Sequence, residues 1–271
     1  MADRGTATAD HRRLRLRASV IARRLQRYDW LVLGAIFVLI LDAGDWLAYI
    51  RSDQFPPLGS DYMAHQNATQ SWLAGGPFYR PYQLAGPYQL AGYADPSFDP
   101  ILYPPAILAL FIPMMAIPIL WWGLPLAVIG FVVWKNRTPS RLFAATALAL
   151  WPTSVFLVTN GSPTLWLVAF LALATVTPFF APLLLLKPTL WPFALYRINE
   201  RRWWLGIALL GVAALSFASL WPDYLTALLN ARDYPGLLHS LSNVPALMIP
   251  LIVSRRPSTV GPNLRLDRER H

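Results

Sequence analysis

Few residues in this chain could do acid–base chemistry, and Asp61 is the clearest of them. It follows Gly59 and Ser60 at the expected start of a short helix, with Ser60 as the capping residue. The helix macrodipole favours an anion in the first turn, and an ionised carboxylate there can accept a proton from a hydroxyl group. Aspartate is also common at ordinary helix starts, so a catalytic and a purely structural role both stay open.

Lys187 is the clearest cationic candidate, because it stands in the apolar sequence LLLLKP. A lone lysine in such surroundings costs free energy unless it meets an anion. Pro188 removes an amide donor and interrupts a helix at this place. We therefore weigh two interpretations: Lys187 binds the phosphate of a lipid carrier, or its side chain extends to the outer membrane interface.

The remaining candidates are weaker. Asp42 and Asp45 lie three residues apart and share a helix face, which either lines a polar cavity or marks the place where the helix leaves the lipid. His65 follows Asp61 by four residues, so the two could interact. There is no cysteine and the four histidines are scattered, so we expect no metal site and no cofactor.

Composition indicates an integral membrane protein of the all-α class. The chain has 271 residues, of which 55% are apolar and only 14% charged, against about 25% charged in typical soluble domains. Residues 101–134 carry no charge at all. A soluble protein needs more polar residues than this to cover its surface.

The distribution of the positive charge predicts orientation. Of the 23 basic residues, 19 fall in residues 1–28, in residues 254–271 and in two short internal clusters at 135–141 and 197–202. Cytoplasmic loops are enriched in Lys and Arg, so we expect a multi-pass protein of a bacterial plasma membrane with both termini on the cytoplasmic side. The basic residues flank apolar runs rather than alternating with aromatics, which argues against nucleic acid as a partner.

Apolar runs predict about eight transmembrane helices, with seven or nine as alternatives. The domains expected are a cytoplasmic tail at 1–28, a transmembrane domain at 29–253 with an outer loop at 51–117, and a cytoplasmic tail at 254–271. The outer loop should hold short surface helices near 61–75 and 103–115, and the duplicated PYQLAG at 81–92 is interpreted as loop lengthening. The predicted spans are 29–50, 118–134, 141–158, 164–177, two half-helices within 178–197, 203–221 and 236–253.

The order of several short motifs resembles the membrane-embedded glycosyltransferases of the C superfamily, most closely family 87. The first is Gly59-Ser60-Asp61-Tyr62, followed by an Ala-rich helix and a segment ending in Gly75-Gly76-Pro77-Phe78-Tyr79. Leu102-Tyr103-Pro104-Pro105 is similar to the YPP segment of the family, and Leu186-Lys187-Pro188-Thr189 to its L-K-P-T stretch. Asn160-Gly161-Ser162-Pro163-Thr164 stands where the family has a G-Q motif. The resemblance covers residues 29–225.

This resemblance implies an inverting transfer of a hexose, mannose by analogy, from a polyprenyl-phosphate donor on the outer face of the membrane. Asp61 would take the proton of an acceptor hydroxyl on a glycan or glycolipid, and Lys187 would stabilise the departing phosphate. Tyr62, Tyr103 and Asn160 match family motifs and are expected to bind substrate, together with His65 and Asp45. No cofactor is implied.

The chain departs from the family pattern in three places. Ser162 replaces the usual Gln, the Gly-rich span that precedes the L-K-P-T stretch in the family is shortened before Lys187, and the chain is shorter at its C-terminus than the family. A non-catalytic scaffold or lipid-binding protein is therefore the main alternative function. A small transporter, using Asp42, Asp45 and Lys187 as intramembrane charges, is the third.

Overall fold

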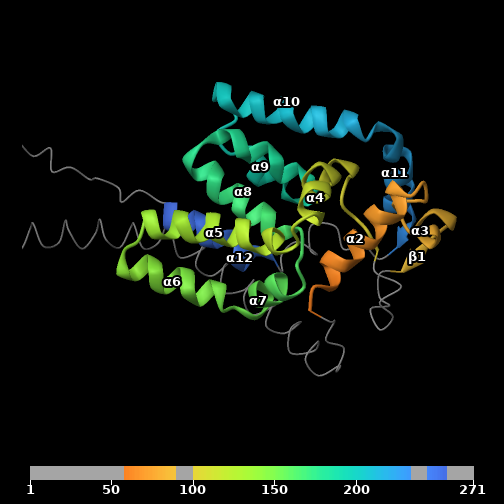
Figure 1. Ribbon diagram of the computed structural model, residues 1–271. Coiled ribbons are helices and arrows are strands. Elements are labelled where there is room, and N and C mark those ends of the chain that lie inside the picture. The colour runs from red at the N-terminus through yellow and green to blue at the C-terminus, as the bar shows by residue number, and fades with distance from the viewer. Residues whose placement is uncertain (1–57, 90–99, 233–242, 255–271) are drawn as a thin grey trace, which may run out of the picture. The chain divides into compact units, whose positions relative to one another are not determined.

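The computed structural model describes residues 58–89, 100–232 and 243–254, which all belong to one compact unit of the chain. The described part is mostly helical, which confirms the all-α class (Figure 1). The predicted span at 29–50 lies outside the described residues, as do Asp42, Asp45 and both tails. The number of transmembrane helices therefore stays a prediction.

Helices account for nearly all of the regular structure in the described ranges. The α-helices are α2 (Ser60–Leu73), α3 (Pro81–Ala85), α4 (Leu108–Met115), α5 (Ile119–Lys135), α6 (Pro139–Ala149), α7 (Pro152–Thr159), α8 (Thr164–Val176), α9 (Trp191–Ala194), α10 (Arg201–Ser216), α11 (Trp221–Asn230) and α12 (Val244–Ser254). Four 3₁₀ segments connect them: η2 (Pro105–Ile107), η3 (Pro178–Leu186), η4 (Pro188–Leu190) and η5 (Ala218–Leu220). The two-residue strands β1 (Tyr88–Gln89) and β2 (Ala231–Arg232) pair in parallel.

Prolines divide one predicted span into two helices. We expected a single helix over 141–158, but the chain forms α6 and α7, which are bent by 64° relative to each other. Trp151 precedes Pro152 and is extended, with φ −62° and ψ 136°. The ring of a proline disfavours the helical conformation in the residue before it, so α6 ends and a new helix begins with Pro152 in its first turn.

The segment 178–197 is broken where the sequence predicted. Lys187 is extended, with φ −126° and ψ 98°, and separates η3 from η4. The expected half-helices are 3₁₀ segments followed by the one-turn α9, because Pro182, Pro188 and Pro192 each remove an amide donor from the ladder. The interruption at Lys187-Pro188 is thus confirmed.

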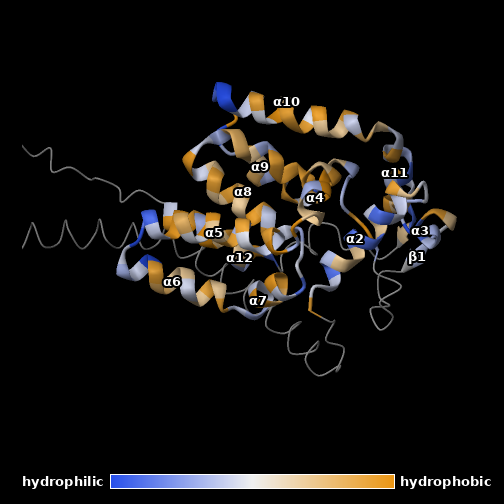
Figure 2. Ribbon diagram, in the orientation of Figure 1, coloured by the Kyte–Doolittle hydropathy of each residue, from blue (hydrophilic) through white to orange (hydrophobic). Residues whose placement is uncertain are grey.

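Helix α8 lies at the centre of the packing. It contacts α5, α12 and η3, and α10 packs on the opposite side of η3 (Figure 1). Nearly every side chain of α8 from Thr164 to Ala174 is buried. Figure 2 shows mainly apolar residues along the visible sides of α5, α8 and α10, and α8 has no polar residue between Leu165 and Ala174. A helix that is apolar all round is typical of a large core or a membrane.

By length and composition, pairs of helices are the candidates for crossing a membrane. In the described ranges no single helix is both long and apolar enough to do so. Three consecutive pairs reach the required length together, each with a sharp bend: Pro105–Met115 with Ile119–Lys135 (107°), α6 with α7 (64°), and Arg201–Ser216 with Ala218–Asn230 (72°).

The duplicated hexapeptide has two different structures. Its first copy forms α3, in which the buried Gln83 side chain accepts a hydrogen bond from Ile101 N (3.2 Å) and donates to Ile101 O (3.1 Å). Its second copy begins with β1, where the Tyr88 hydroxyl donates to Ala227 O at 2.9 Å. The duplication therefore does more than lengthen a loop, since both copies bind α11: Asn230 Nδ2 donates to Gln83 O of the first copy at 2.9 Å, and Tyr88 of the second copy donates to Ala227 O.

Candidate functional site

Asp61 is positioned by the way α2 begins. Gly59 is the residue before the helix and has φ 75°, a left-handed conformation that glycine adopts without a steric penalty. Its N–H donates to Thr159 O (2.8 Å), and the N–H of Tyr62 donates to Asn160 O (3.3 Å). The prediction that Ser60 caps this helix is wrong, because the chain enters through Gly59 and no side chain caps the first turn. The start of α2 is thus bound to the end of α7.

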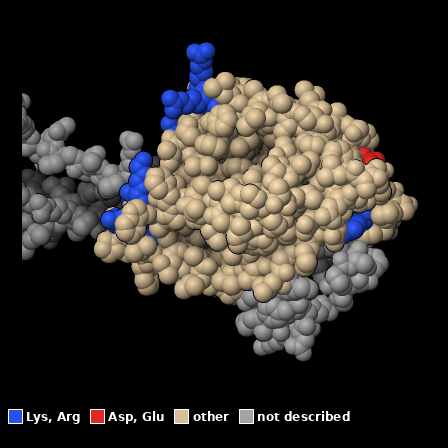
Figure 3. Space-filling view, viewed as in Figure 1, with Lys and Arg blue, Asp and Glu red and all other residues tan. Residues whose placement is uncertain are grey.

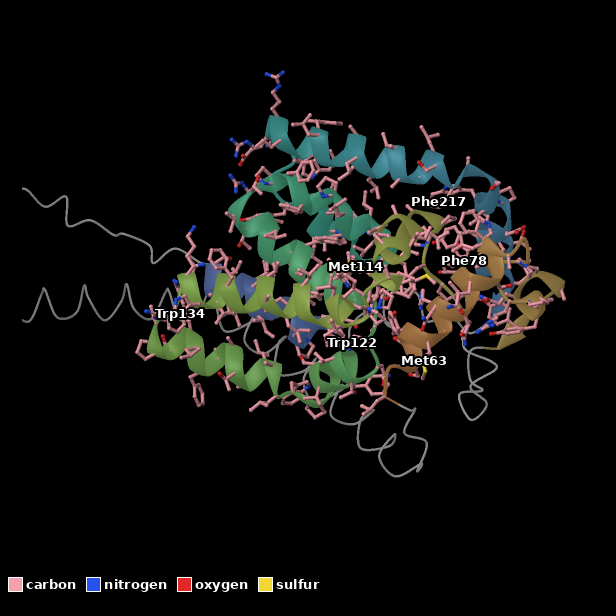
Figure 4. The ribbon with its side chains drawn as sticks, viewed as in Figure 1. Met63, Phe78, Met114, Trp122, Trp134 and Phe217 are labelled. Atoms are coloured by element: carbon pink, nitrogen blue, oxygen red, sulfur yellow. The ribbon has the colours of Figure 1, made fainter. Side chains whose placement is uncertain are left out.

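Two tryptophans of α5 hold the turn to which α2 is bound. Trp121 Nε1 donates to Gly161 O (2.7 Å), and Trp122 Nε1 donates to Val158 O (2.9 Å). Gly161 has φ 66°, and a Cβ atom there would lie 2.6 Å from the Trp122 ring. Figure 4 labels Trp122, whose ring centroid is 5.0 Å from that of Tyr62. Because of this close packing, α5 fixes the position of the first turn of α2.

His65 contacts Asp61, as its spacing predicted, but through the main chain. Its Nδ1–H donates to the carbonyl oxygen of Asp61 at 2.8 Å, with the tautomer assigned from this acceptor. His65 is only 6% exposed. Burial lowers the pKa of His65 to about 4, with a further lowering from Arg80 and an opposing effect from the Asp61 hydrogen bond. The imidazole is therefore neutral near pH 7.

A chain of polar groups connects Tyr103 to Lys187. The Tyr103 hydroxyl and Thr164 Oγ1 are 2.9 Å apart, and Lys187 Nζ donates to the same Thr164 oxygen at 3.3 Å. Tyr103 also lies against His65, with ring centroids 5.4 Å apart. The hydroxyl of Tyr79 donates to Tyr103 O at 3.0 Å, which holds this segment in place. Residues from α2, the 103 segment, α8 and the η3–η4 break thus meet at one place.

Asp61 and Lys187 stand at the two ends of this cluster. Lys187 lies at the break between η3 and η4, and its ammonium group reaches Tyr103 through the Thr164 hydroxyl. The ring of Tyr103 lies against His65, which donates to the main chain of Asp61. The two residues are 126 positions apart in the sequence, so only the packing of α2 on the 159–164 turn brings them together.

Six of the seven residues predicted for the site are described, and they contribute in different ways. Asp61, His65, Tyr103 and Lys187 form the polar cluster, and Tyr62 lies beside it among aromatic rings. Asn160 is buried, and its main-chain oxygen holds α2. Asp45 lies outside the described residues.

Thr164, which joins Tyr103 to Lys187, was not among the residues predicted for the site. It is 1% exposed and begins α8 directly after the Asn160–Pro163 turn. A threonine at the start of a helix is ordinary, so its type and place carry little signal. The one signal in the sequence was that Thr164 ends the motif that begins at Asn160.

The cluster offers a carboxylate, an ammonium group and hydroxyl groups at one place. Such a set can accept a proton, stabilise an anion and orient hydroxylated substrates. In the ranges the structure describes, no group of three or more acidic or histidine side chains could hold a metal ion. Comparison of the chain with family models, with curated proteins and with solved structures finds no match. The functional assignment therefore rests on the residues of the site.

Proposed function

We propose that the protein is a membrane glycosyltransferase of the C-superfamily type, which moves a hexose, mannose by analogy, from a polyprenyl-phosphate donor to a glycan or glycolipid acceptor. Asp61 accepts the proton of the acceptor hydroxyl. The acceptor oxygen then forms a bond to the anomeric carbon as the bond from that carbon to the phosphate oxygen breaks. A single displacement of this kind inverts the anomeric centre.

The departing phosphate carries the negative charge that this displacement creates. A fixed cation near the leaving oxygen lowers the barrier, because it stabilises that charge without reorganisation. Lys187 supplies this cation, and Thr164 and Tyr103 orient it. Neutral His65 fixes the first turn of α2 without adding a second positive charge beside Asp61.

One observation carries the proposal: a continuous series of contacts leads from Asp61 through His65, Tyr103 and Thr164 to Lys187, so a base and a cation far apart in sequence belong to one cluster. A base and a leaving-group cation must act on the same substrate, so this proximity is a requirement of the mechanism. Their convergence on Thr164 and Tyr103 adds hydroxyl groups suited to a sugar phosphate.

The membrane setting is supported by the surface of the described helices. Large apolar side chains are exposed on α5, α6, α10 and α11. On the face shown in Figure 3, Lys and Arg atoms lie at the edges, and the broad surface between them carries no charged side chain. At the end of α5, where Figure 4 labels Trp134, the guanidinium of Arg137 lies 3.5 Å from the centroid of the Trp134 ring. Tryptophan is enriched at membrane interfaces.

The direct test is transfer from polyprenyl-phosphate mannose by the purified full chain in lipid nanodiscs. Asp61→Asn preserves the size of the side chain and removes the base, so we expect transfer to fall by at least about 100-fold, the lower range for general-base catalysis. Asp223 stands in the first turn of α11 and is the matched control. Asp223→Asn should retain wild-type transfer.

Three results would contradict the proposal. Full activity of Asp61→Asn would remove Asp61 from the mechanism. Binding of the lipid donor without any turnover, unaffected by Asp61→Asn, would instead favour the non-catalytic lipid-binding protein. Uptake of a solute by proteoliposomes that depends on Asp45 would favour the transporter.

A further inference from the structure

Three buried polar atoms close to the site have no hydrogen-bond partner in the described structure. They are the Tyr62 hydroxyl, His65 Nε2 and Trp166 Nε1. Their residues are 5%, 6% and 8% exposed. A buried polar group left without a partner costs about 1–3 kcal/mol, so such groups are rare and each one calls for an explanation.

All three belong to one cluster of aromatic rings. The ring centroid of Tyr62 is 5.3 Å from that of Phe111 and 5.8 Å from that of Trp121. His65 lies 5.9 Å from Phe111, and Trp166 lies 5.8 Å from Trp121. Phe111 and Trp121 are themselves in edge contact at 4.7 Å. We call these five residues the aromatic cluster.

The chemistry of the three atoms defines the ligand that would satisfy them. His65 uses its Nδ1–H on the Asp61 carbonyl, so Nε2 is an acceptor only. The indole N–H of Trp166 is a donor only, and the hydroxyl of Tyr62 is both. An anion cannot donate to His65, and a lipid tail would leave all three groups unpaired. A neutral group with several hydroxyls both donates and accepts.

We propose that the aromatic cluster is the subsite for the sugar ring of the donor, with hydroxyls of that ring bound by Tyr62, His65 and Trp166. Aromatic faces pack well against the C–H groups of a sugar ring, and the hydroxyls provide the missing partners. This inference rests on the proposed function and names the part of the donor that the cluster recognises.

The position of the cluster agrees with this role. Tyr62 and His65 stand one and four residues after Asp61 on α2, and Trp166 stands two residues after Thr164 on α8. The cluster therefore shares α2 with the base Asp61 and α8 with Thr164, the hydrogen-bond partner of Lys187. In the proposed reaction the anomeric carbon must lie between Asp61 and Lys187.

The test compares two lipids, polyprenyl-phosphate mannose and sugar-free polyprenyl phosphate, in equilibrium binding to the purified full chain in nanodiscs. Tyr62→Phe and Trp166→Phe each remove a polar atom and keep an aromatic ring. We expect each variant to bind the mannose lipid about tenfold more weakly, the effect of about one lost hydrogen bond, and the sugar-free lipid as the wild type does. His65→Asn, which keeps a donor near the Nδ1 position, should behave in the same way.

The melting temperature of the ligand-free protein provides a second readout. The Tyr62 hydroxyl has no partner without ligand, so Tyr62→Phe should leave the melting temperature unchanged or raise it. Tyr88→Phe is the matched control, because the Tyr88 hydroxyl donates to Ala227 O. That control should lower the melting temperature and leave the affinities for both lipids unchanged.

The outcomes separate the subsite from the proposed function. Equal weakening for both lipids, or no weakening, in Tyr62→Phe and Trp166→Phe overturns the sugar subsite while the glycosyltransferase proposal stands. A melting temperature that falls in Tyr62→Phe as it does in Tyr88→Phe also counts against the subsite. A wild-type protein that binds neither lipid overturns the proposed function and the subsite with it.

Discussion

Lys187 Nζ donates a hydrogen bond to Thr164 Oγ1 at 3.3 Å, and the same oxygen is 2.9 Å from the hydroxyl of Tyr103. Thr164 begins a regular helix, whereas Lys187 lies at an interruption between two 3₁₀ segments. Helix α8 thus holds the break between η3 and η4. The hydrogen bond to Thr164 fixes the direction of the Lys187 side chain at a place where the helix is interrupted.

Thr164→Val should weaken the site by removing this shared oxygen. The change keeps the shape of the side chain but leaves the ammonium of Lys187 and the hydroxyl of Tyr103 without their common partner. We expect transfer to fall by at least about tenfold and the free energy of unfolding to fall by about 1–3 kcal/mol. Transfer from polyprenyl-phosphate mannose and chemical denaturation measure the two effects.

Thr175→Val is the control on the same helix. The Thr175 hydroxyl donates only to Ala172 O, one turn earlier. Its loss should leave transfer unchanged and alter the free energy of unfolding by less than about 1 kcal/mol. Equal effects of the two substitutions would show that Thr164 acts only through the stability of α8.

Acid should destabilise the protein through His65. The unfolded chain protonates histidine near pH 6.5, whereas burial holds the pKa of His65 at about 4 in the folded state. Between these values the unfolded state binds more protons, so the free energy of unfolding falls as the pH falls, by up to about 3 kcal/mol. Thermal unfolding of wild type and His65→Asn from pH 7 to pH 4 measures the difference.

The difference between the two unfolding curves isolates His65, because carboxylates and the other histidines titrate in both proteins. The variant should lose less stability than the wild type as the pH falls from about 6.5. Parallel curves over this range would contradict a neutral, buried His65.

Two glycines of α10 should respond in opposite directions to alanine. A Cβ atom at Gly206 would lie 2.1 Å from the carbonyl oxygen of Phe179 on η3, whereas one at Gly211 meets nothing within 4 Å. We expect Gly206→Ala to cost about 1–3 kcal/mol by forcing α10 away from η3. Gly211→Ala should stabilise by up to about 1 kcal/mol through helix propensity.

Denaturation of both variants measures these effects, and Gly211→Ala also controls for the general consequence of adding a methyl group to α10. A neutral Gly206→Ala would mean that α10 and η3 are not in the close contact described.

Much of the fold was accessible from the sequence because its signals are local. Apolar runs located α5 and α8, and Pro188 after Lys187 predicted the interruption there. Helices that a proline divides were harder to predict: Pro152 splits the run 141–158 into α6 and α7, although the residues on both sides of it are mainly apolar. The duplicated PYQLAG shows the limit of local signals, since identical residues form α3 in one copy and begin β1 in the other.

The sequence by itself determined which residues are candidates for the chemistry, because a chain this apolar holds few charges, and Asp61 and Lys187 were among them. Only the tertiary structure decided that these two belong to one cluster, that Thr164 joins Lys187 to Tyr103, and that His65 binds the main chain of Asp61. Residue type and spacing predict which side chains lie close together on one helix. Contacts across more than a hundred residues depend on how α2 packs on the 159–164 turn, which no local pattern encodes.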